Sequence, residues 1–388
     1  MEHDEAVRIF SLHPAVEVLS PQPEDLAELG LILLRFDDGE TIGLNPELIP
    51  PAGPGETEEA FIERVHLELD ARRGSSEDDE RGPESALPAP RSADYFLPRA
   101  GARLGQVGRL TDFIGVALAI DEPNALRMVM ERDLPADRGE LDDFQLLSRA
   151  VVNLHDMEDD GLALREVGLG PDVVAVTSPY GHEVAWFADL GTMGQVLQAC
   201  GAQSGSEWVA IPAARNDLLL VNSATEQWEP VLEMLETKVE ARDGIHPVPH
   251  VVREGRWVRY IPPLQEPLWR RFQTLRLRSE NVIHAPQRNF LQESLLESGE
   301  SEVDYVAEFN GAASETEIFS WAAVSLALER TSIPRVDRVF FAEGESGHRV
   351  SFDDLRARLP HLVMPHPGTY PPRYIVLRPS EEELTRLF

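Results

Sequence analysis

The chain has almost no cysteine or lysine. Among its 388 residues, Cys200 is the only cysteine and Lys238 is the only lysine. A single cysteine excludes an internal disulfide and any zinc or redox site built from paired cysteines. Cys200 falls on the apolar side of a predicted helix, which favours an inert core thiol over a nucleophile. We interpret the use of arginine in place of lysine as the mark of a high-GC genome.

Long apolar runs are also missing. No stretch approaches the length of a membrane span, so we expect no membrane partner. The first ten residues are acidic and lack the apolar core of a signal peptide. These features predict a cytoplasmic protein.

The common catalytic motifs are absent as well. The chain contains no GxSxG elbow, no Walker A sequence and no HExxH. The glycine pairs at 101–105 and 191–194 fall short of a phosphate-binding loop. We therefore predict no catalytic residue, no cofactor and no metal ligand from motifs.

Negative charge is what the chain has in excess. Its formal net charge is −33 and its sequence pI is about 4.6. Such a field repels the phosphates of nucleic acids and anionic membranes, so we expect neither as a partner. Residues 1–90 carry 22 acidic side chains against 6 arginines. That segment is either a solvated surface or an acidic recognition surface for a protein.

The clearest structural pattern lies at residues 172–223. Val173–Val176, Trp208–Ile211 and Leu218–Val221 are short apolar runs between turn residues, which is typical of buried strands. Between the first two runs, Leu190–Cys200 has helical spacing and is followed by Gly201, a residue that often ends a helix. This order predicts the middle of an α+β core.

The segments on either side continue this pattern. We predict a hairpin at 31–44, helices at 57–73, 142–156 and 225–241, and strands at 113–120, 248–252 and 257–261. Residues 74–92 are charged and rich in proline, and we predict an insertion there that is either disordered or a surface excursion. The segment 125–130 is compatible with either a strand or a helix.

Residues 266–388 are predicted to form a second unit. A mixed segment at 268–290 precedes a helix at 315–329, strands at 336–341 and 374–377, and a final helix that begins at Ser380. The predicted organisation is thus a 1–265 domain and a 266–388 extension. Both are of the α+β class, with mixed or antiparallel sheets and packed amphipathic helices.

Several of these runs together resemble one family. They are DDGETIGLNP, GETEEAFIERVHLEL, FIGVALAIDEPNALRMVMERDL, DVVAVTSP, SEWVAIPAARNDLLLVNS and HPVPHVVREGRWVRYIP. Over residues 25–263 the chain resembles the bacterial domain of unknown function 1444, the YtpQ-like proteins. The resemblance implies an α+β fold in the bacterial cytoplasm. It implies no catalytic or cofactor-binding residue, and the 266–388 extension lies outside it.

The histidines are the residues best suited to bind a metal. His246 and His250 frame HPVPH, and His361 and His366 have a similar spacing. Prolines extend the backbone there, so neither pair can form an i, i+4 helical metal site. The segment around His155 lacks the ligand spacing of a calcium loop. We interpret these histidines as surface or loop residues, while a metal site assembled from distant segments stays open.

One cluster of arginines stands out in so acidic a chain. The cluster consists of Arg270, Arg271, Arg276, Arg278 and Arg288. Arginines among aromatic residues can bind single-stranded nucleic acid, but the overall charge opposes this. They are predicted either to pair with the chain's own carboxylates or to bind an anionic partner.

Three hypotheses for the function follow. The first is a non-catalytic interaction or adaptor protein with a protein partner. The second is a hydrolase whose histidines and acidic residues come together from distant segments. The third is an acidic mimic of DNA that inhibits a nucleic-acid-binding protein.

Overall fold

The chain folds into two compact units of the α+β class. The structure, a computed structural model, describes residues 3–19, 32–37, 41–44, 57–73, 82–98, 103–122, 125–157, 161–241, 243–298, 302–314, 317–343 and 346–388. The first unit comprises residues 1–82 and 120–127, and the second comprises residues 83–119 and 128–388. The predicted boundary at 265/266 falls inside the second unit and stays a prediction.

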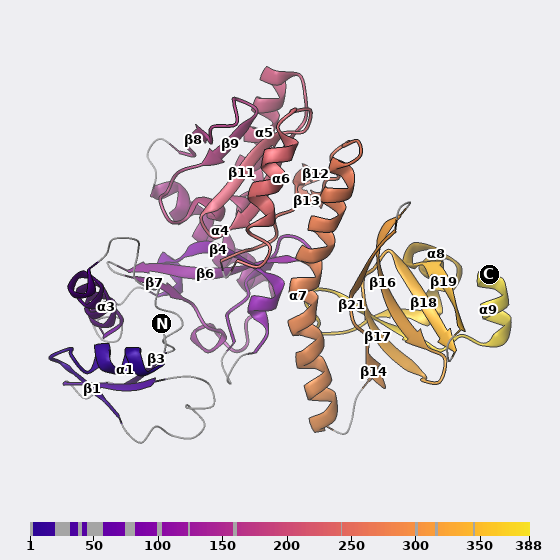
Figure 1. The fold of residues 1–388 in the computed structure, drawn as a ribbon, viewed down its shortest axis with the longest axis horizontal. Coiled ribbons are helices and arrows are strands. Elements are labelled where there is room, and N and C mark those ends of the chain that lie inside the picture. Colours follow the sequence, from indigo (N-terminus) through magenta and orange to yellow (C-terminus); the bar gives the residue numbers. More distant parts are fainter. Residues whose placement is uncertain are drawn as a thin grey trace. The chain divides into compact units, whose positions relative to one another are not determined.

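The first unit is a small sheet covered by two helices (Figure 1). The antiparallel strands β1 (Val16–Val18), β2 (Ile32–Phe36) and β3 (Thr41–Leu44) pack with α1 (His3–Phe10) and α3 (Glu58–Arg73). Strands β2 and β3 confirm the predicted hairpin, and α3 confirms the predicted helix. Phe61, Val65 and Leu69 of α3 are buried in the core, as their spacing predicts.

The central sheet of the second unit contains the predicted core strands. Its order is β13-β12-β10-β11-β9-β8, and its pairs are antiparallel. The strands are β8 (Leu164–Glu166), β9 (Val173–Val176), β10 (Trp208–Ala214), β11 (Asp217–Asn222), β12 (His250–Arg253) and β13 (Arg256–Arg259). Every residue of β10 is buried, because the sheet is covered on both faces.

Helices cover both faces of this sheet. They are α4 (Glu140–Asp156), α5 (Leu190–Ser204), α6 (Trp228–Glu236) and the 3-10 turn η5 (Glu183–Ala188). Helix α5 runs past the predicted stop at Gly201 and ends at Gly205, whose φ of 74° suits glycine. The thiol of Cys200 is partly buried, and burial raises its pKa.

A smaller sheet lies beside the central one. Its members are β4 (Leu87–Ser92), β5 (Gly108–Arg109), β6 (Ile114–Glu122) and β7 (Ala125–Met128). The short 3-10 helix η2 (Pro83–Ser85) precedes β4, η3 (Ala93–Phe96) follows it, and η4 (Glu131–Asp133) comes after β7. The prediction of disorder is wrong for residues 83–92, because β4 pairs with β6 and all six of its residues are buried. Pro88 and Pro90 are two residues apart, so both can turn their ring nitrogens away from β6 on an edge strand. Residues 74–81 lie outside the described residues.

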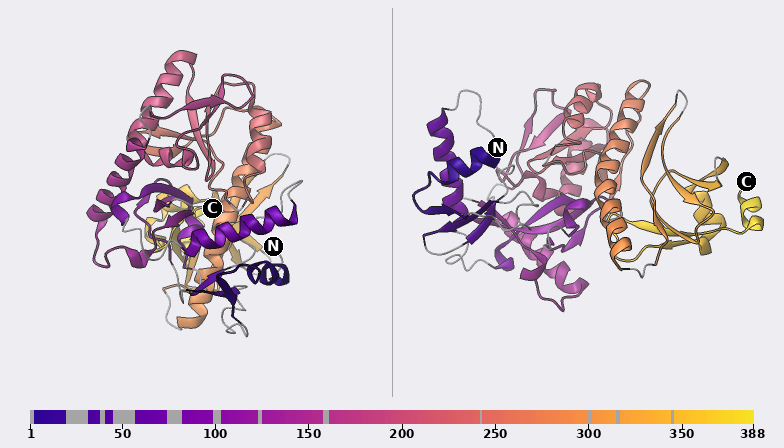
Figure 2. Two further views of the ribbon diagram at one scale, coloured as in Figure 1. Left: turned by 90° about the vertical axis from the view of Figure 1, so that its left-hand side faces the viewer. Right: turned by 60° about the horizontal axis from the view of Figure 1, so that its bottom comes forward.

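Helix α7 (Leu268–Ser298) links the central sheet to the C-terminal part of the second unit (Figures 1 and 2). It packs against α6 on one side and against β14, β15 and β16 on the other. Residues 268–290, for which the sequence indicated no single type of secondary structure, are continuously helical. Pro286 lies within the helix.

Two four-stranded sheets form the C-terminal part. One has the order β14-β17-β21-β20 and the other β15-β16-β18-β19. The strands are β14 (Tyr305–Val306), β15 (Asn310–Ala313), β16 (Ile318–Ser325), β17 (Arg330–Pro334), β18 (Arg338–Glu343), β19 (Ser346–Ser351), β20 (Val363–Pro365) and β21 (Arg373–Leu377). The helical elements are α8 (Phe352–Arg358), η6 (Pro360–Leu362) and α9 (Glu381–Leu387).

In this part the predicted helix at 315–329 is wrong, whereas the strands predicted at 336–341 and 374–377 are confirmed as β18 and β21. Residues 318–325 form β16 and not a helix, because pairing with β15 and β18 overrides the local helical preference of an alanine-rich sequence. Helix α9 is confirmed together with its start, since the Ser380 hydroxyl accepts a hydrogen bond from the Glu383 backbone N–H.

Candidate ligand-binding cleft

A polar cleft of about 790 Å³ lies within the second unit. It is formed by the loop after β5, the β12–β13 hairpin, one face of α7, and the C-terminal segments around 335–337, 353 and 370–372. The cleft is thus lined both by segments that precede α7 in the chain and by segments that follow it. Its volume is within the range of small-molecule sites, which commonly form where two packed parts meet.

A stripe of buried polar residues runs along one face of α7, and three of them, Arg276, Glu280 and His284, line the cleft. The residues of the stripe are spaced three or four positions apart, which places them on one helical face, and each is at most 5% exposed. They are Gln273, Arg276, Glu280, His284 and Gln287. A buried polar face on a helix is costly unless its groups have partners, so this stripe marks the functional side of α7.

Two carboxylates hold the arginines of the inner wall in place. Arg276 pairs with Glu280 at 3.1 Å and with Asp337 at 3.0 Å, and Glu280 also pairs with Arg259. Ser320 donates to Asp337 through its backbone N–H at 2.7 Å and its hydroxyl at 3.0 Å. Burial opposes ionisation of Asp337, but Arg276 and Ser320 hold the pKa of this carboxyl below its usual value.

Three histidines of the cleft are each about 1% exposed: His246, His250 and His284. Among the described residues, neither ring nitrogen of His246 or of His284 has a hydrogen-bonding partner. The ring of Phe113 stacks on His246 at 4.8 Å and meets His284 edge-on at 5.5 Å, measured between ring centroids. The prediction of surface or loop histidines is wrong for His250, which is buried in β12, whereas His246 lies in a loop as predicted but is buried there.

These imidazoles are neutral. Burial lowers the pKa of each, and nearby positive charges lower it further. Burial and Arg259 lower the pKa of His250 to about 3, and burial and Arg373 lower that of His284 to about 3. At neutral pH each ring therefore has one N–H donor and one acceptor nitrogen.

Two arginines of the cleft have no carboxylate partner in the described part of the chain. Both Arg109 and Arg256 are exposed. The guanidinium of Arg109 lies over the ring of Tyr370, 4.7 Å from its centroid, and the Tyr370 hydroxyl donates to the Thr111 carbonyl at 3.1 Å. Burial raises the pKa of that hydroxyl well above its usual value, so it stays a donor.

Positive charge slightly exceeds negative charge around the cleft. The basic lining residues are Arg109, Arg256, Arg259, Arg276 and Arg335. The acidic lining residues are Asp112, Glu280, Asp337 and Asp353. In a chain of net charge −33, this is a local region suited to an anion.

No group of three or more histidine, cysteine, aspartate or glutamate side chains in the described residues is placed to hold a metal ion. Arg259 and Arg276 lower the pKa of His246, and the same positive field repels a divalent cation.

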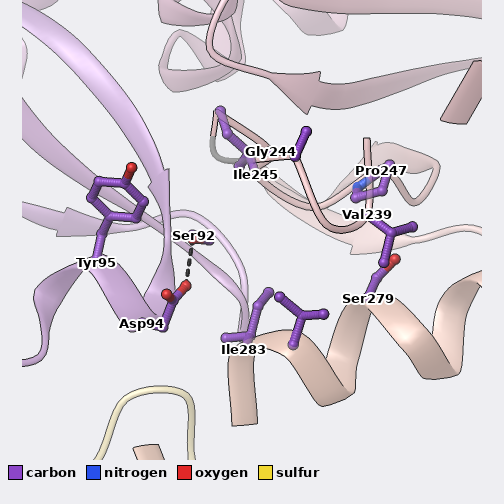
Figure 3. Close-up of a pocket in the computed structure, with 11 residues that line it drawn as sticks. Ser92, Asp94, Tyr95, Val239, Gly244, Ile245, Pro247, Ser279 and Ile283 are labelled. Carbon is purple, nitrogen blue, oxygen red and sulfur yellow. Dashed lines mark hydrogen bonds between the residues drawn. The ribbon is translucent and has the colours of Figure 1, made fainter. Parts of the chain in front are cut away.

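A second cavity of about 390 Å³ lies on the other side of the 244–247 loop (Figure 3). Ile245 and Pro247 line it, whereas His246 between them lines the cleft. On α7, Ser279 and Ile283 line the cavity, and the hydroxyl of Ser279 donates to the carbonyl of its own helix at Leu275. This cavity has no buried unpartnered side-chain polar atom among its lining residues, so the larger cleft is the candidate site.

The structure places the five predicted arginines along α7 in different surroundings. Only Arg276 lines the cleft. Arg271 forms a two-pronged pair with Glu236 of α6, at 2.7 and 2.8 Å. The remaining contacts are Arg270 with the Ser314 carbonyl, Arg278 with Glu240 at 2.7 Å and Arg288 with Glu308 at 3.5 Å. Carboxylate partners within the chain are thus found for Arg271, Arg276, Arg278 and Arg288, and the role of the five arginines toward an anionic partner stays a prediction.

The other histidines considered from the sequence lie apart from this cleft's lining. His155 is exposed and pairs with Asp189 at 2.8 Å, and His361 is exposed and pairs with Glu383 at 2.6 Å. The Nδ1 atom of His366 lies 2.9 Å from the Ser332 hydroxyl. The prediction of surface histidines is confirmed for His155 and His361, whereas His366 is only partly exposed.

The sequence reasoning missed His284, Glu280 and Asp337. The signal for the α7 residues was present, because polar residues recur at helical spacing from 273 to 287. Asp337 could not be found in this way, since its contact with Arg276 spans 61 positions.

Comparison of the chain with protein families, curated proteins and solved structures gives no match. In the described residues, no helix is both long and apolar enough to cross a membrane.

Proposed function

We propose that this protein binds a small anionic ligand in the cleft beside α7. The observation that carries the proposal is the pair of uncompensated arginines, Arg109 and Arg256, at a cleft whose inner wall holds buried neutral imidazoles. Guanidinium groups recognise carboxylates and phosphates through paired N–H donors. The inner carboxylates already have arginine partners, so they do not cancel these two charges.

The test is a calorimetric titration of the full-length protein with inorganic phosphate at low ionic strength. We expect saturable binding at one site, and Arg256→Gln should weaken it about tenfold through the loss of one charge-assisted contact. Arg253→Gln is a matched control, because Arg253 faces Arg256 across the same hairpin but pairs with Glu207 and does not line the cleft. Absence of saturable binding, or equal effects of the two variants, would contradict the proposal.

The predicted hydrolase would use the same cleft. His246 and His284 could act on a bound substrate, but their lowered pKa values make them weak bases at neutral pH. Glu280 and Asp337 are engaged by arginines. Binding is therefore better supported than hydrolysis.

A second candidate function is the predicted adaptor role with a protein partner. The observation that favours it lies on α4, where Leu141, Phe144 and Val152 share one face and are 68%, 66% and 47% exposed. Exposed apolar groups of this kind favour protein contacts. Affinity capture from a bacterial lysate should retain a defined protein with the full-length chain and lose it with Leu141→Glu/Phe144→Glu. Equal capture by both forms would contradict a role of this face.

Other expectations from the sequence stay proposals. These are the cytoplasmic location, the bacterial source, the resemblance to domain of unknown function 1444 over residues 25–263, and inhibition by DNA mimicry.

A further inference from the structure

A free strand edge lies beside α7. Strand β15 is at the end of its sheet and pairs only with β16 in the described part of the chain. A groove of about 530 Å³ is lined by β15 and by an exposed stripe of α7 that consists of Thr274, Arg278, Asn281 and Ala285. This groove and the polar cleft have no lining residue in common.

The backbone groups at this edge point outward at Gly311 and Ala313. Ser320 of β16 lies opposite Gly311, but its backbone N–H donates to Asp337, on the β18 side of β16. The N–H and C=O of one strand residue point to the same side, and the side alternates along the strand. The residues of β15 that bond to β16 are therefore the even-numbered ones, and Gly311 and Ala313 point their N–H and C=O groups away from the sheet.

These outward groups are accessible. Gly311 and Ala313 are both exposed, and the exposed surface of Gly311 is that of its backbone, because glycine has no side chain. Among the described residues, neither has a hydrogen bond outside the β15–β16 pair. The small side chains of β15 and of Ala285 leave room for those of an added strand. An unpaired edge of this kind is a template for an extended peptide.

The charge of the groove selects the peptide. Arg278 and Arg288 line it together with a single carboxylate, that of Glu308. The partners of these arginines, Glu240 and Glu308, are 70% and 58% exposed, so the ion pairs are weak and a carboxylate of a ligand can replace them. The arginines are about 15 Å apart along the helix, and an extended segment of about five residues covers that length.

We propose that this groove binds an extended acidic segment of a partner protein, which adds to β15 as a further strand. Its backbone pairs with Gly311 and Ala313, and its carboxylates pair with Arg278 and Arg288. A second copy of this chain is less favourable, because its net charge of −33 repels an identical chain. The inference goes beyond the proposed function, since both the site and the ligand are different.

The experiment measures peptide binding to the full-length protein by fluorescence anisotropy at low ionic strength. The probes are two labelled, capped heptapeptides, Thr-Glu-Val-Glu-Val-Glu-Thr and Thr-Lys-Val-Lys-Val-Lys-Thr, which alternate polar and β-branched residues as a strand requires. We expect saturable binding of the acidic peptide, at least about tenfold tighter than that of the lysine peptide. The net charge of the chain favours the lysine peptide at any non-specific site, so the opposite preference indicates the groove.

Variants of β15 test the addition of a strand. Ala313→Pro removes the outward N–H and leaves the pairing with β16 intact, since proline is tolerated where an edge strand faces solvent. It should weaken binding of the acidic peptide about fivefold, as expected for one lost hydrogen bond. Ala313→Ser keeps the N–H and is the matched control, with a change of less than about twofold.

A second pair of variants tests the charge. Arg278→Gln should weaken the acidic peptide about fivefold, and it keeps the test available if Ala313→Pro does not fold. Arg253→Gln is its control, because Arg253 also pairs with a glutamate but does not line the groove.

Several results would overturn the inference. They are no saturable binding of the acidic peptide, tighter binding of the lysine peptide, equal affinities in Ala313→Pro and Ala313→Ser, and equal affinities in Arg278→Gln and Arg253→Gln. A dimer in light scattering that Ala313→Pro dissociates would assign the edge to a second copy of the chain and overturn it as well. None of these results bears on phosphate binding in the cleft.

Discussion

Mild acid should destabilise the second unit, because three buried histidines cannot take up protons while it is folded. His246, His250 and His284 are each about 1% exposed. Burial, followed by neighbouring arginines and other cationic groups, lowers their pKa values, to about 3 for His250 and His284. In the unfolded chain the same groups have a pKa near 6.5.

The sign and size of the effect follow from proton linkage. Below about pH 6.5 the unfolded state binds protons that the folded state does not, so stability is lost as the pH falls from 6.5 toward 3. Between about pH 7.5 and about pH 5.5, each such histidine lowers the free energy of unfolding by about 1.4 kcal/mol. Three together would lower it by about 4 kcal/mol, a large share of the stability of a typical domain.

Tryptophan fluorescence during urea unfolding can measure this loss of unfolding free energy in the second unit alone. The six tryptophans lie between Trp186 and Trp321, so all of them report on that unit. His284→Gln should reduce the loss by about 1.4 kcal/mol, because it removes one buried titrating group. His348→Gln, a change at an exposed position outside the cleft, should leave the loss as in the wild type.

Two results would refute the reasoning. One is a wild-type loss below about 1 kcal/mol between these two pH values. The other is an equal pH dependence in the wild type and in His284→Gln.

Three further substitutions test the packing around the cleft. Asp337→Asn should lower the free energy of unfolding in urea by about 2 kcal/mol, because it leaves the buried Arg276 without one of its two carboxylates. Asp353→Asn, at an exposed position, is the control. Equal effects of the two substitutions would contradict a stabilising role of the Arg276–Asp337 pair. Arg271→Lys should lower the free energy of unfolding by about 1 kcal/mol, because the two-pronged pair with Glu236 is lost. An unchanged urea midpoint would show that this pair contributes nothing to stability. Gly115→Ala should lower the free energy of unfolding by about 1–3 kcal/mol, since the added Cβ would lie 2.6 Å from the Phe96 ring. An unchanged thermal unfolding temperature would contradict this close packing.

The central strands could be predicted because local and long-range preferences agree there. Residues 173–176, 208–214 and 218–221 are apolar throughout, as strands covered on both faces require. The prediction failed where the two preferences conflict. β16 contains alanines that favour a helix, but the pairing with β15 and β18 places Ser320, Ala322 and Val324 alternately inward.

The cleft was harder to predict, because its residues come together from distant segments. The prolines around His246 and His250 indicate extended backbone, which is correct near β12, but not the burial of the rings. Burial there depends on α7 and on the loop that contains Phe113. Periodicity along one segment contains no information on such contacts.

The most direct test of an anion site beside α7 is NMR of the histidine rings. Full-length protein labelled with ¹⁵N at histidine would be measured with and without inorganic phosphate, with assignments from His246→Phe and His284→Phe. The account predicts that the ring resonances of His246 or His284 shift on phosphate addition, while the exposed His361 stays unchanged. Shifts confined to exposed histidines, or no shift at saturating phosphate, would contradict it.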